Sequence, residues 1–215
     1  MRRVLAVIVA SVALFSGLLA PPAGATIGVS SWHQQPVTDI SAVNGVSCPD
    51  SNHCWAVGFS GDVLDYHAAI LATDDRGVTW VAQPAPAPAS FSQLNAVACP
   101  DVMHCVAVGW TYVSGGVSAS LIVATSDGGA TWLAQSGPAG NTVLNAVACA
   151  SDEACWVAGS RTTAGTSTAV IAATTNGGGT WTPQTPPAGE TDLKGVSCGD
   201  PLHCWAVGTT SSIAA

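Results

Sequence analysis

The chain has 215 residues, of which 48% are hydrophobic and 8% charged, so it can bury a sizeable core but has few charges for ionic chemistry. Its formal net charge is −8. Nucleic acids, anionic membrane surfaces and phosphorylated ligands all require clustered lysine and arginine, so this composition argues against the three as partners.

The first 25 residues have the pattern of a secretory signal peptide. Met1-Arg2-Arg3 is positively charged, the run Val4–Ala20 is apolar, and an A-x-A pattern ends at Ala25. The alternative is an uncleaved membrane anchor, because the apolar run is close to the shortest that can span a bilayer. The A-x-A pattern and two helix-breaking prolines favour cleavage before Thr26. The sequence therefore predicts export to the cell envelope or the medium, with no stable membrane insertion afterwards. Three strong cations would remain, namely Arg76, Arg161 and Lys194.

From residue 32 onward, short phrases recur about fifty residues apart in a fixed order. A phrase with two cysteines begins at Val43, Leu94, Leu144 and Leu193. An octapeptide recurs at Thr73–Trp80, Thr125–Trp132 and Thr174–Trp181. A tryptophan is followed three residues later by glutamine at Trp32/Gln35, Trp80/Gln83, Trp132/Gln135 and Trp181/Gln184. Such regular recurrence indicates a stack of structural repeats.

The unit that begins at Leu94 shows the expected strands in chain order. "LNAVAC" and "CVAVGW" read as two strands around the turn "PDVMH", "SLIVATS" as a third, and "ATWLAQ" as a fourth after the tight turn "DGG". No later segment has a sustained helical period. Four short strands per repeat describe a propeller blade, which buries its faces only against neighbouring blades. The sequence thus predicts an all-β propeller of four-stranded antiparallel blades.

Residues 26–215 are expected to form one repeat domain of about four blade-equivalents. The units run over about 43–92, 93–142 and 143–192, with a partial unit at 193–215. The strand within 26–36 can complete the last blade and close a ring. The abrupt end of the repeats favours a truncated chain or an open arc instead. An open arc would expose apolar faces and sheet edges, so self-association is expected in that case.

The octapeptide resembles the Asp-box, or BNR repeat, with the pattern T-x-D-x-G-x-T-W. The matching residues are Asp75, Gly77 and Trp80, then Asp127, Gly129 and Trp132, then Asn176, Gly178 and Trp181, with asparagine replacing the aspartate in the third copy. Asp-boxes are found in β-propellers such as sialidases, sortilin-type receptors and photosystem II assembly factors. The resemblance implies a turn between the third and fourth strands of a blade.

The residue types of the octapeptide suit a structural role. The aspartate or asparagine can accept hydrogen bonds from the N–H groups of its own turn, and glycine permits backbone angles closed to other residues. The tryptophan can fill the gap between adjacent blades. The alternative is that Asp75, Asp127 and Asn176 bind a ligand or Ca²⁺.

Eight cysteines form four C-x5-C pairs, each bracketing the turn between the first two strands of a unit. An even number at regular spacing in an exported chain predicts disulfides: Cys48 with Cys54, Cys99 with Cys105, Cys149 with Cys155, and Cys198 with Cys204. A histidine precedes the second cysteine in three pairs, at His53, His104 and His203, so zinc binding is the alternative. The spacing does not fit zinc fingers, and no metal or other cofactor is expected.

The preferred functional hypothesis is a non-catalytic exported propeller that binds a protein or glycan partner or scaffolds an assembly. The loops between second and third strands vary most, and they carry the candidate ligand-binding residues Tyr66, His67, Trp110, Tyr112 and Arg161. Ordinary solvent loops are the alternative for these segments.

The competing hypothesis is a relative of the sialidase-like glycoside hydrolases. Sialidases hold the substrate carboxylate with three arginines and use a tyrosine nucleophile backed by a glutamate. After export this chain keeps two arginines, and neither G-x-S-x-G nor H-E-x-x-H occurs. No catalytic residues can be assigned from the sequence.

Overall fold

The computed structural model describes residues 6–10, 32–86, 91–113 and 115–210, and within these ranges the regular structure is entirely β. Blade 1 contains β3 (Ala42–Ser47), β4 (Cys54–Asp62), β5 (Asp65–Thr73) and β6 (Val81–Gln83). Blade 2 contains β7 (Ser92–Ala98), β8 (Cys105–Val113), β9 (Val117–Thr125) and β10 (Leu133–Gln135). Blade 3 contains β11 (Asn141–Cys149), β12 (Cys155–Thr163), β13 (Thr166–Thr174) and β14 (Thr182–Gln184). A last sheet contains β15 (Glu190–Asp200) and β16 (His203–Thr210).

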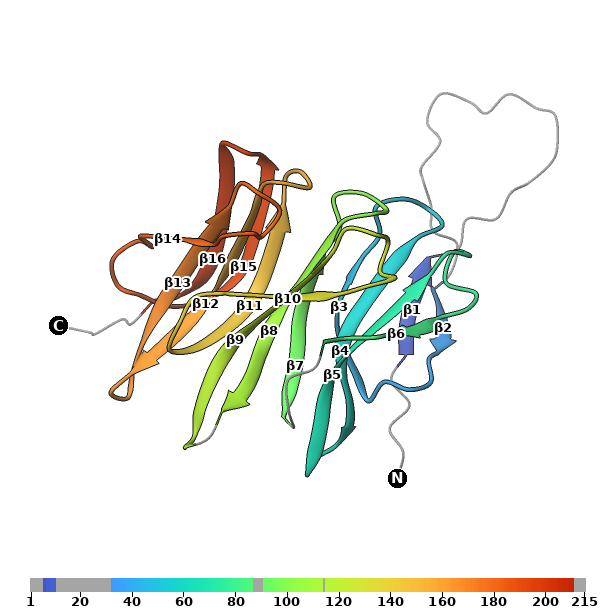
Figure 1. The fold of residues 1–215 in the computed structure, drawn as a ribbon, viewed down its shortest axis with the longest axis horizontal. Coiled ribbons are helices and arrows are strands. Elements are labelled where there is room, and N and C mark those ends of the chain that lie inside the picture. The colour runs from blue at the N-terminus through green and yellow to red at the C-terminus, as the bar shows by residue number, and fades with distance from the viewer. Residues whose placement is uncertain (1–5, 11–31, 87–90, 114, 211–215) are drawn as a thin grey trace.

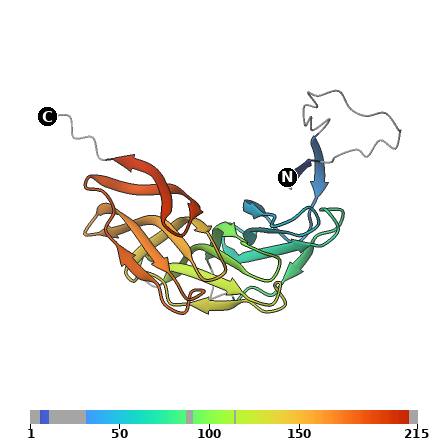
Figure 2. The same ribbon diagram turned by 90° about the horizontal axis from the view of Figure 1, so that it is seen from above.

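Each blade pairs its four strands antiparallel in chain order, which confirms the predicted all-β fold of propeller blades. Figure 1 shows the blades standing side by side, with their strands roughly aligned. Seen from above in Figure 2, they follow an open arc, with blade 1 at one tip and the last sheet at the other. Over the residues that the structure describes, the arc does not close into a ring.

The N-terminal strand lies apart from the last sheet. β2 (Trp32–Pro36) pairs antiparallel with β1 (Ala6–Ala10), which belongs to the predicted signal peptide. The rest of that peptide and its cleavage site lie outside the described residues, as do the residues after Thr210. Closure of a ring by the strand within 26–36 therefore stays a prediction. A search of the described residues for helices that could span a membrane finds none.

A bulge recurs in the first strand of each of the three blades and of the last sheet. In blade 2 the register shifts between Leu94 and Ala96, so Asn95 is the extra residue. Gly109 lies opposite, where a side chain would collide with the backbone of Gln93. The bulge turns the Asn95 amide toward blade 3, where it donates to the Leu144 carbonyl at 2.7 Å. Asn44 and Asn145 make the same bond to Leu94 and Leu193. Neighbouring sheets are thus held in register by one side chain per blade.

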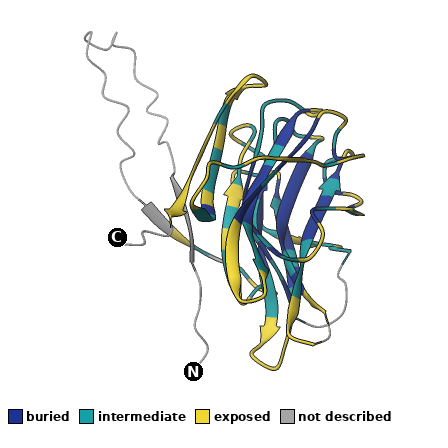
Figure 3. Cartoon of the chain, turned by 90° about the vertical axis from the view of Figure 1, so that its left-hand side faces the viewer, coloured by how far each residue is buried: buried dark blue, intermediate teal, exposed yellow. Residues whose placement is uncertain are grey.

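The hydrophobic core consists of the interfaces between neighbouring sheets, here called seams. In each seam, alternate residues of the second and third strands of one blade pack against the first strand of the next blade. In the first seam Val57 and Ile70 of blade 1 pack with Leu94 of blade 2. Buried residues are concentrated in the middle of the arc, and the end sheets carry more exposed ones (Figure 3). Burial of the blade faces thus depends on repetition.

Candidate functional site

The octapeptide turns are closed by hydrogen bonds between their own residues. In blade 2 the Asp127 carboxylate accepts from the Thr131 N–H at 2.9 Å and from the Thr131 and Thr125 hydroxyls at 2.6 and 2.7 Å. The Gly129 N–H donates to the Thr125 hydroxyl oxygen at 2.9 Å, and Gly129 has φ of 89°, which favours glycine. Asp75 has the same partners in blade 1. All the polar atoms of the carboxylate are therefore engaged within the turn.

These bonds favour the ionised carboxylate. Hydrogen bonds from Thr131 and Thr125 lower the pKa of Asp127 to about 2, and bonds from Thr79 lower that of Asp75. In the third copy the neutral Asn176 accepts from the Thr180 N–H and donates from Nδ2 to the Thr180 hydroxyl, so the turn keeps its shape without a charge. The three hydrogen bonds of the turn would compete with any external cation for the oxygens of this carboxylate.

We expect Asp127→Asn to reduce the dependence of stability on pH in acid. A carboxylate with a depressed folded-state pKa stabilises the fold above its unfolded pKa of about 3.9, and this contribution is lost as the pH falls through about 2. The wild type should therefore lose stability between about pH 4 and 2 more steeply than Asp127→Asn, as measured by thermal unfolding at each pH. Asn176→Asp is the matched reverse change and should steepen the same slope; equal slopes in all three proteins would contradict the assignment.

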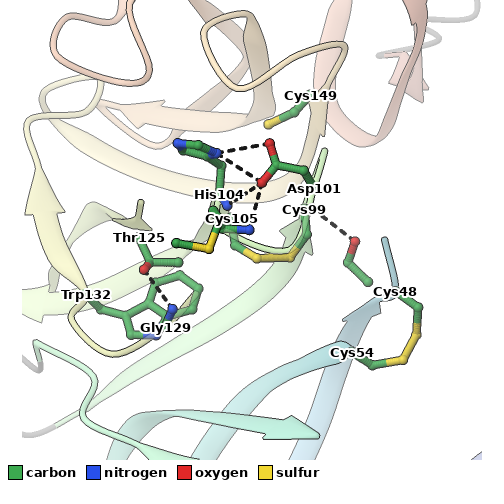
Figure 4. The surroundings of a disulfide bond; sticks show 12 residues. Cys48, Cys54, Cys99, Asp101, His104, Cys105, Thr125, Gly129, Trp132 and Cys149 are labelled. Carbon is green, nitrogen blue, oxygen red and sulfur yellow. Dashed lines mark hydrogen bonds and ion pairs between the residues drawn. A yellow bond between two sulfur atoms is a disulfide. The ribbon is translucent and has the colours of Figure 1, made fainter. Parts of the chain in front are cut away.

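The four predicted disulfides are present and confirm the pairing by C-x5-C hairpins. Their Cα atoms lie 4.0–4.1 Å apart across each hairpin. Four such bridges indicate an oxidising compartment. Figure 4 shows the hairpin of blade 2, where the Asp101 carboxylate accepts from the N–H groups of Met103 and His104 and lies 3.0 Å from His104 Nδ1. The aspartate thus fixes the turn between the two cysteines.

The histidines of these hairpins pair with aspartates of their own turns. His53 Nδ1 lies 2.8 Å from Asp50, and His203 repeats the arrangement with Asp200. Among the described residues, no group of three or more metal-ligating side chains comes together. The recurring Asp-x-x-His spacing is therefore explained by the pairing of the two side chains within each turn.

The repeated Trp-x-x-Gln phrase forms hydrogen bonds across the seams, in which the tryptophan of one repeat donates to the glutamine of the preceding repeat. In the first seam Trp132 Nε1 donates to Gln83 Oε1 at 2.9 Å, and in the second Trp181 Nε1 donates to Gln135 Oε1 at 3.0 Å. Gln135 also donates to the Gly177 carbonyl in the turn that carries Trp181. The phrase was visible in the sequence, but its pairing was not, because the partners come from successive repeats.

An aromatic cluster forms where the second and third strands of blades 1 and 2 approach their hairpins. It consists of Phe59, Tyr66, Phe91, Trp110 and Tyr112, with ring centroids 5.2–6.3 Å apart. Backbone bonds hold it together, because the Phe91 N–H donates to the Tyr66 carbonyl and the Tyr112 N–H donates to the Phe91 carbonyl. Tyr112 is 44% exposed and the other four rings are half-buried. Three of the five predicted binding residues thus share one surface.

The other two predicted residues do not join the rings. His67 follows Tyr66 on β5, and its Nε2 lies 3.2 Å from Asp65. Arg161 belongs to blade 3, and its Nε donates to the Thr142 hydroxyl across the β11–β12 pair. Phe59 and Phe91, which complete the cluster, were not among the residues predicted from the sequence. Phe91 has φ of 66°, an unusual value for a residue other than glycine, and no sequence pattern indicated it.

A separate cavity of about 530 Å³ opens between blades 2 and 3 on the side of the octapeptide turns. Its lining includes His104, Asp152, Glu153 and Gln135. It is built from residues of the turns and of the seam between the two blades.

Comparison with known proteins yields similarity of fold. No protein-family model matches the chain, and no curated protein does. Among solved structures, YCF48 bound to a D1 peptide matches 66% of this chain and 40% of its own at 19% identity, with a TM-score of 0.46. YCF48 from Cyanidioschyzon merolae matches 79% and 51% at 18% identity and 0.48. The GH74 xyloglucanase from Xanthomonas campestris matches 70% and 26% at 13% identity and 0.46. The chain spans about half or less of each of these proteins.

Proposed function

We propose that this protein is an exported, non-catalytic propeller module that binds a protein or glycan partner at the cell envelope through the aromatic cluster. The observation that carries the proposal is the gathering of five aromatic rings from two blades on one partly exposed surface. Exposed aromatic groups that adjoin one another mark interaction sites more often than scattered apolar residues do.

The chemistry of the cluster suits ligands with flat apolar faces. Half-buried rings lose little side-chain freedom on binding, and the Tyr112 hydroxyl already accepts from the Gly116 N–H, which holds the ring near its hairpin. Stacking on a pyranose ring or contact with an apolar peptide side chain requires such a fixed surface. The scarcity of cations supports a neutral ligand over a phosphorylated one.

Export rests on the N-terminal pattern and on the four disulfides. An oxidised chain is expected to fold after crossing a membrane, where its signal peptide would be removed. Mass spectrometry of the secreted protein should then show an N-terminus at Thr26.

Trp110→Ala is expected to weaken ligand binding about tenfold or more, because central aromatic residues of a binding surface contribute roughly 1–3 kcal/mol. Ligands are sought on a glycan array and a peptide library, and affinities are then measured by calorimetry for the wild type and the variant. Leu133→Ala is the control, since Leu133 is a large exposed apolar residue on β10 and does not belong to the aromatic cluster. An equal loss in both variants would contradict the site. Reproducible turnover of a glycoside would contradict the non-catalytic assignment.

A further inference from the structure

The cavity between blades 2 and 3 lies where one residue departs from the repeat. The residue after the second cysteine of the hairpin is tryptophan in three of the sheets, at Trp55, Trp156 and Trp205, but it is Val106 in blade 2. In the first seam Trp55 is 3% exposed and is part of the hydrophobic core. Val106 lines the cavity of about 530 Å³ in the second seam. Because valine is much smaller than tryptophan, the second seam lacks the indole that occupies this place in the first.

A second departure changes the chemistry of the same place. In the first seam Val102, three residues after the first cysteine of its hairpin, packs against the cluster that contains Trp55. Its counterpart in the second seam is Asp152, and the next residue is Glu153 in place of Met103. Both acids line the cavity. The seam between blades 2 and 3 thus combines more space with carboxylates where the first seam is filled and apolar.

The turn that carries these two acids does not use their carboxylates. The aspartate that caps the other three hairpins is replaced here by Ser151, whose hydroxyl oxygen accepts from the N–H groups of Glu153 and Ala154 at 3.3 and 3.0 Å. The Glu153 carbonyl accepts from the Gly177 N–H at 3.0 Å, which fixes the hairpin to the octapeptide turn of its own blade. The side chains of Asp152 and Glu153 form no hydrogen bond or ion pair with any other residue that the structure describes. Two unpaired carboxylates are therefore held at the exposed part of the cavity.

The charge of the cavity favours a cation. Its lining, which consists of described residues, contains no lysine or arginine, and its histidine, His104, already pairs with Asp101 at 3.0 Å (Figure 4). The chain as a whole has a formal net charge of −8, which adds to the negative potential. Because the described residues bring no three metal-ligating side chains together, an organic cation fits the cavity better than a metal ion does.

We infer that this cavity binds an arginine side chain of a protein partner, with the guanidinium at Asp152 and Glu153. The planar guanidinium donates to carboxylates through two parallel N–H groups, which suits a pair of acids that have no other partner. The aliphatic stem of the arginine would lie along the apolar part of the lining, which includes Val106, Ala124 and Leu133.

The size of the cavity favours a peptide over a free amino acid. Its volume of about 530 Å³ is within the usual range of ligand sites, about 300–1,000 Å³. Such a space holds an arginine side chain together with parts of its neighbours in the partner. Leu133 is 68% exposed, so an apolar neighbour of the arginine would gain a contact there. The inference does not rest on the aromatic cluster, which is formed by blades 1 and 2 and shares no residue with this cavity.

The test is a nuclear magnetic resonance titration with the peptide acetyl-Leu-Arg-Leu-amide. The backbone amide resonances of His104, Asp152 and Glu153 should shift and saturate. The same peptide with citrulline in place of arginine keeps the shape but loses the charge, and it should bind at least about tenfold more weakly. Equal binding of the two peptides would overturn the inference, as would shifts confined to Trp110 and the aromatic cluster. Tighter binding of spermidine than of the arginine peptide would overturn it in favour of a free polyamine.

The acids are tested by a pair of matched double variants. Asp152→Asn with Glu153→Gln should weaken binding of the arginine peptide at least about tenfold in low salt, where exposed charges are least screened. Asp39→Asn with Asp74→Asn is the control, since it removes two exposed acids that do not line the cavity. It should leave the affinity within about twofold of the wild type. Equal losses in the two double variants would mean that only net charge matters and would overturn the inference.

Val106→Trp tests the cavity without changing its charge. The substitution restores the residue found in the other three sheets, so the indole should fill the space and abolish binding of the arginine peptide. Thermal unfolding checks that the variant is folded, and the acid variants decide the matter if overpacking prevents folding. A folded Val106→Trp that binds the peptide as tightly as the wild type would overturn the inference.

Discussion

Trp132→Ala is expected to lower the free energy of unfolding by about 3–5 kcal/mol, the usual cost of truncating a fully buried aromatic residue. Trp132 is 4% exposed and packs with the core of the first seam. The substitution would leave a cavity between blades 1 and 2 and would leave Gln83 Oε1 without its donor. Urea unfolding followed by circular dichroism measures the change.

The matched control is Trp80→Ala. Trp80 occupies the same position of its octapeptide, but it is only half-buried and its Nε1 has no acceptor among the described residues. Its removal should cost clearly less than removal of Trp132. Trp132→Phe should lie between the two, because it keeps most of the buried area and loses the hydrogen bond, worth about 1–2 kcal/mol. Equal losses for Trp80→Ala and Trp132→Ala would show that the seam does not depend on the Trp–Gln pair.

Reduction of the disulfides is expected to have the other large effect. Each bridge closes a short hairpin loop and restricts the unfolded chain, which contributes about 2 kcal/mol. Four bridges together approach the whole stability of a typical domain, about 5–15 kcal/mol. The melting temperature should therefore fall by about 15–30 °C in reductant, as measured by calorimetry with and without dithiothreitol.

Individual bridges can be compared by replacing both cysteines of a pair with alanine. Loss of Cys99–Cys105 should cost more than loss of Cys198–Cys204, because Cys105 is buried in the first seam whereas the last sheet is open to solvent. A melting temperature that moves by less than about 5 °C on full reduction would contradict the view that the bridges stabilise the hairpins.

Features confined to one repeat could be predicted from the sequence. The octapeptide closes its turn with bonds between residues at most four apart, such as Asp127 and Thr131, so its residue types suffice to specify the turn. The C-x5-C spacing likewise determines the disulfides, because both cysteines belong to one hairpin. The all-β fold follows from strands and turns of the same local kind.

Features that join repeats required the tertiary structure. The bond between Trp132 and Gln83 and the cluster around Phe91 depend on how one sheet stacks on the next. Stacking is set by side-chain packing across a seam, which a single repeat does not encode. For the same reason the sequence supplied the candidates Tyr66, Trp110 and Tyr112 but could not separate them from Arg161, which lies on another blade.

The sequence by itself determined the structural repeat, which consists of four short strands, one hydrogen-bonded turn and one disulfide and recurs along the chain. Only the tertiary structure decided which faces of the sheets are buried and which side chains stay exposed. The physical reason is that turns and hairpins close within a few residues, whereas burial of a sheet face depends on what lies next to it. The sheet that follows blade 3 has two strands among the described residues, and a cavity lined by Gln184 lies between that sheet and blade 3.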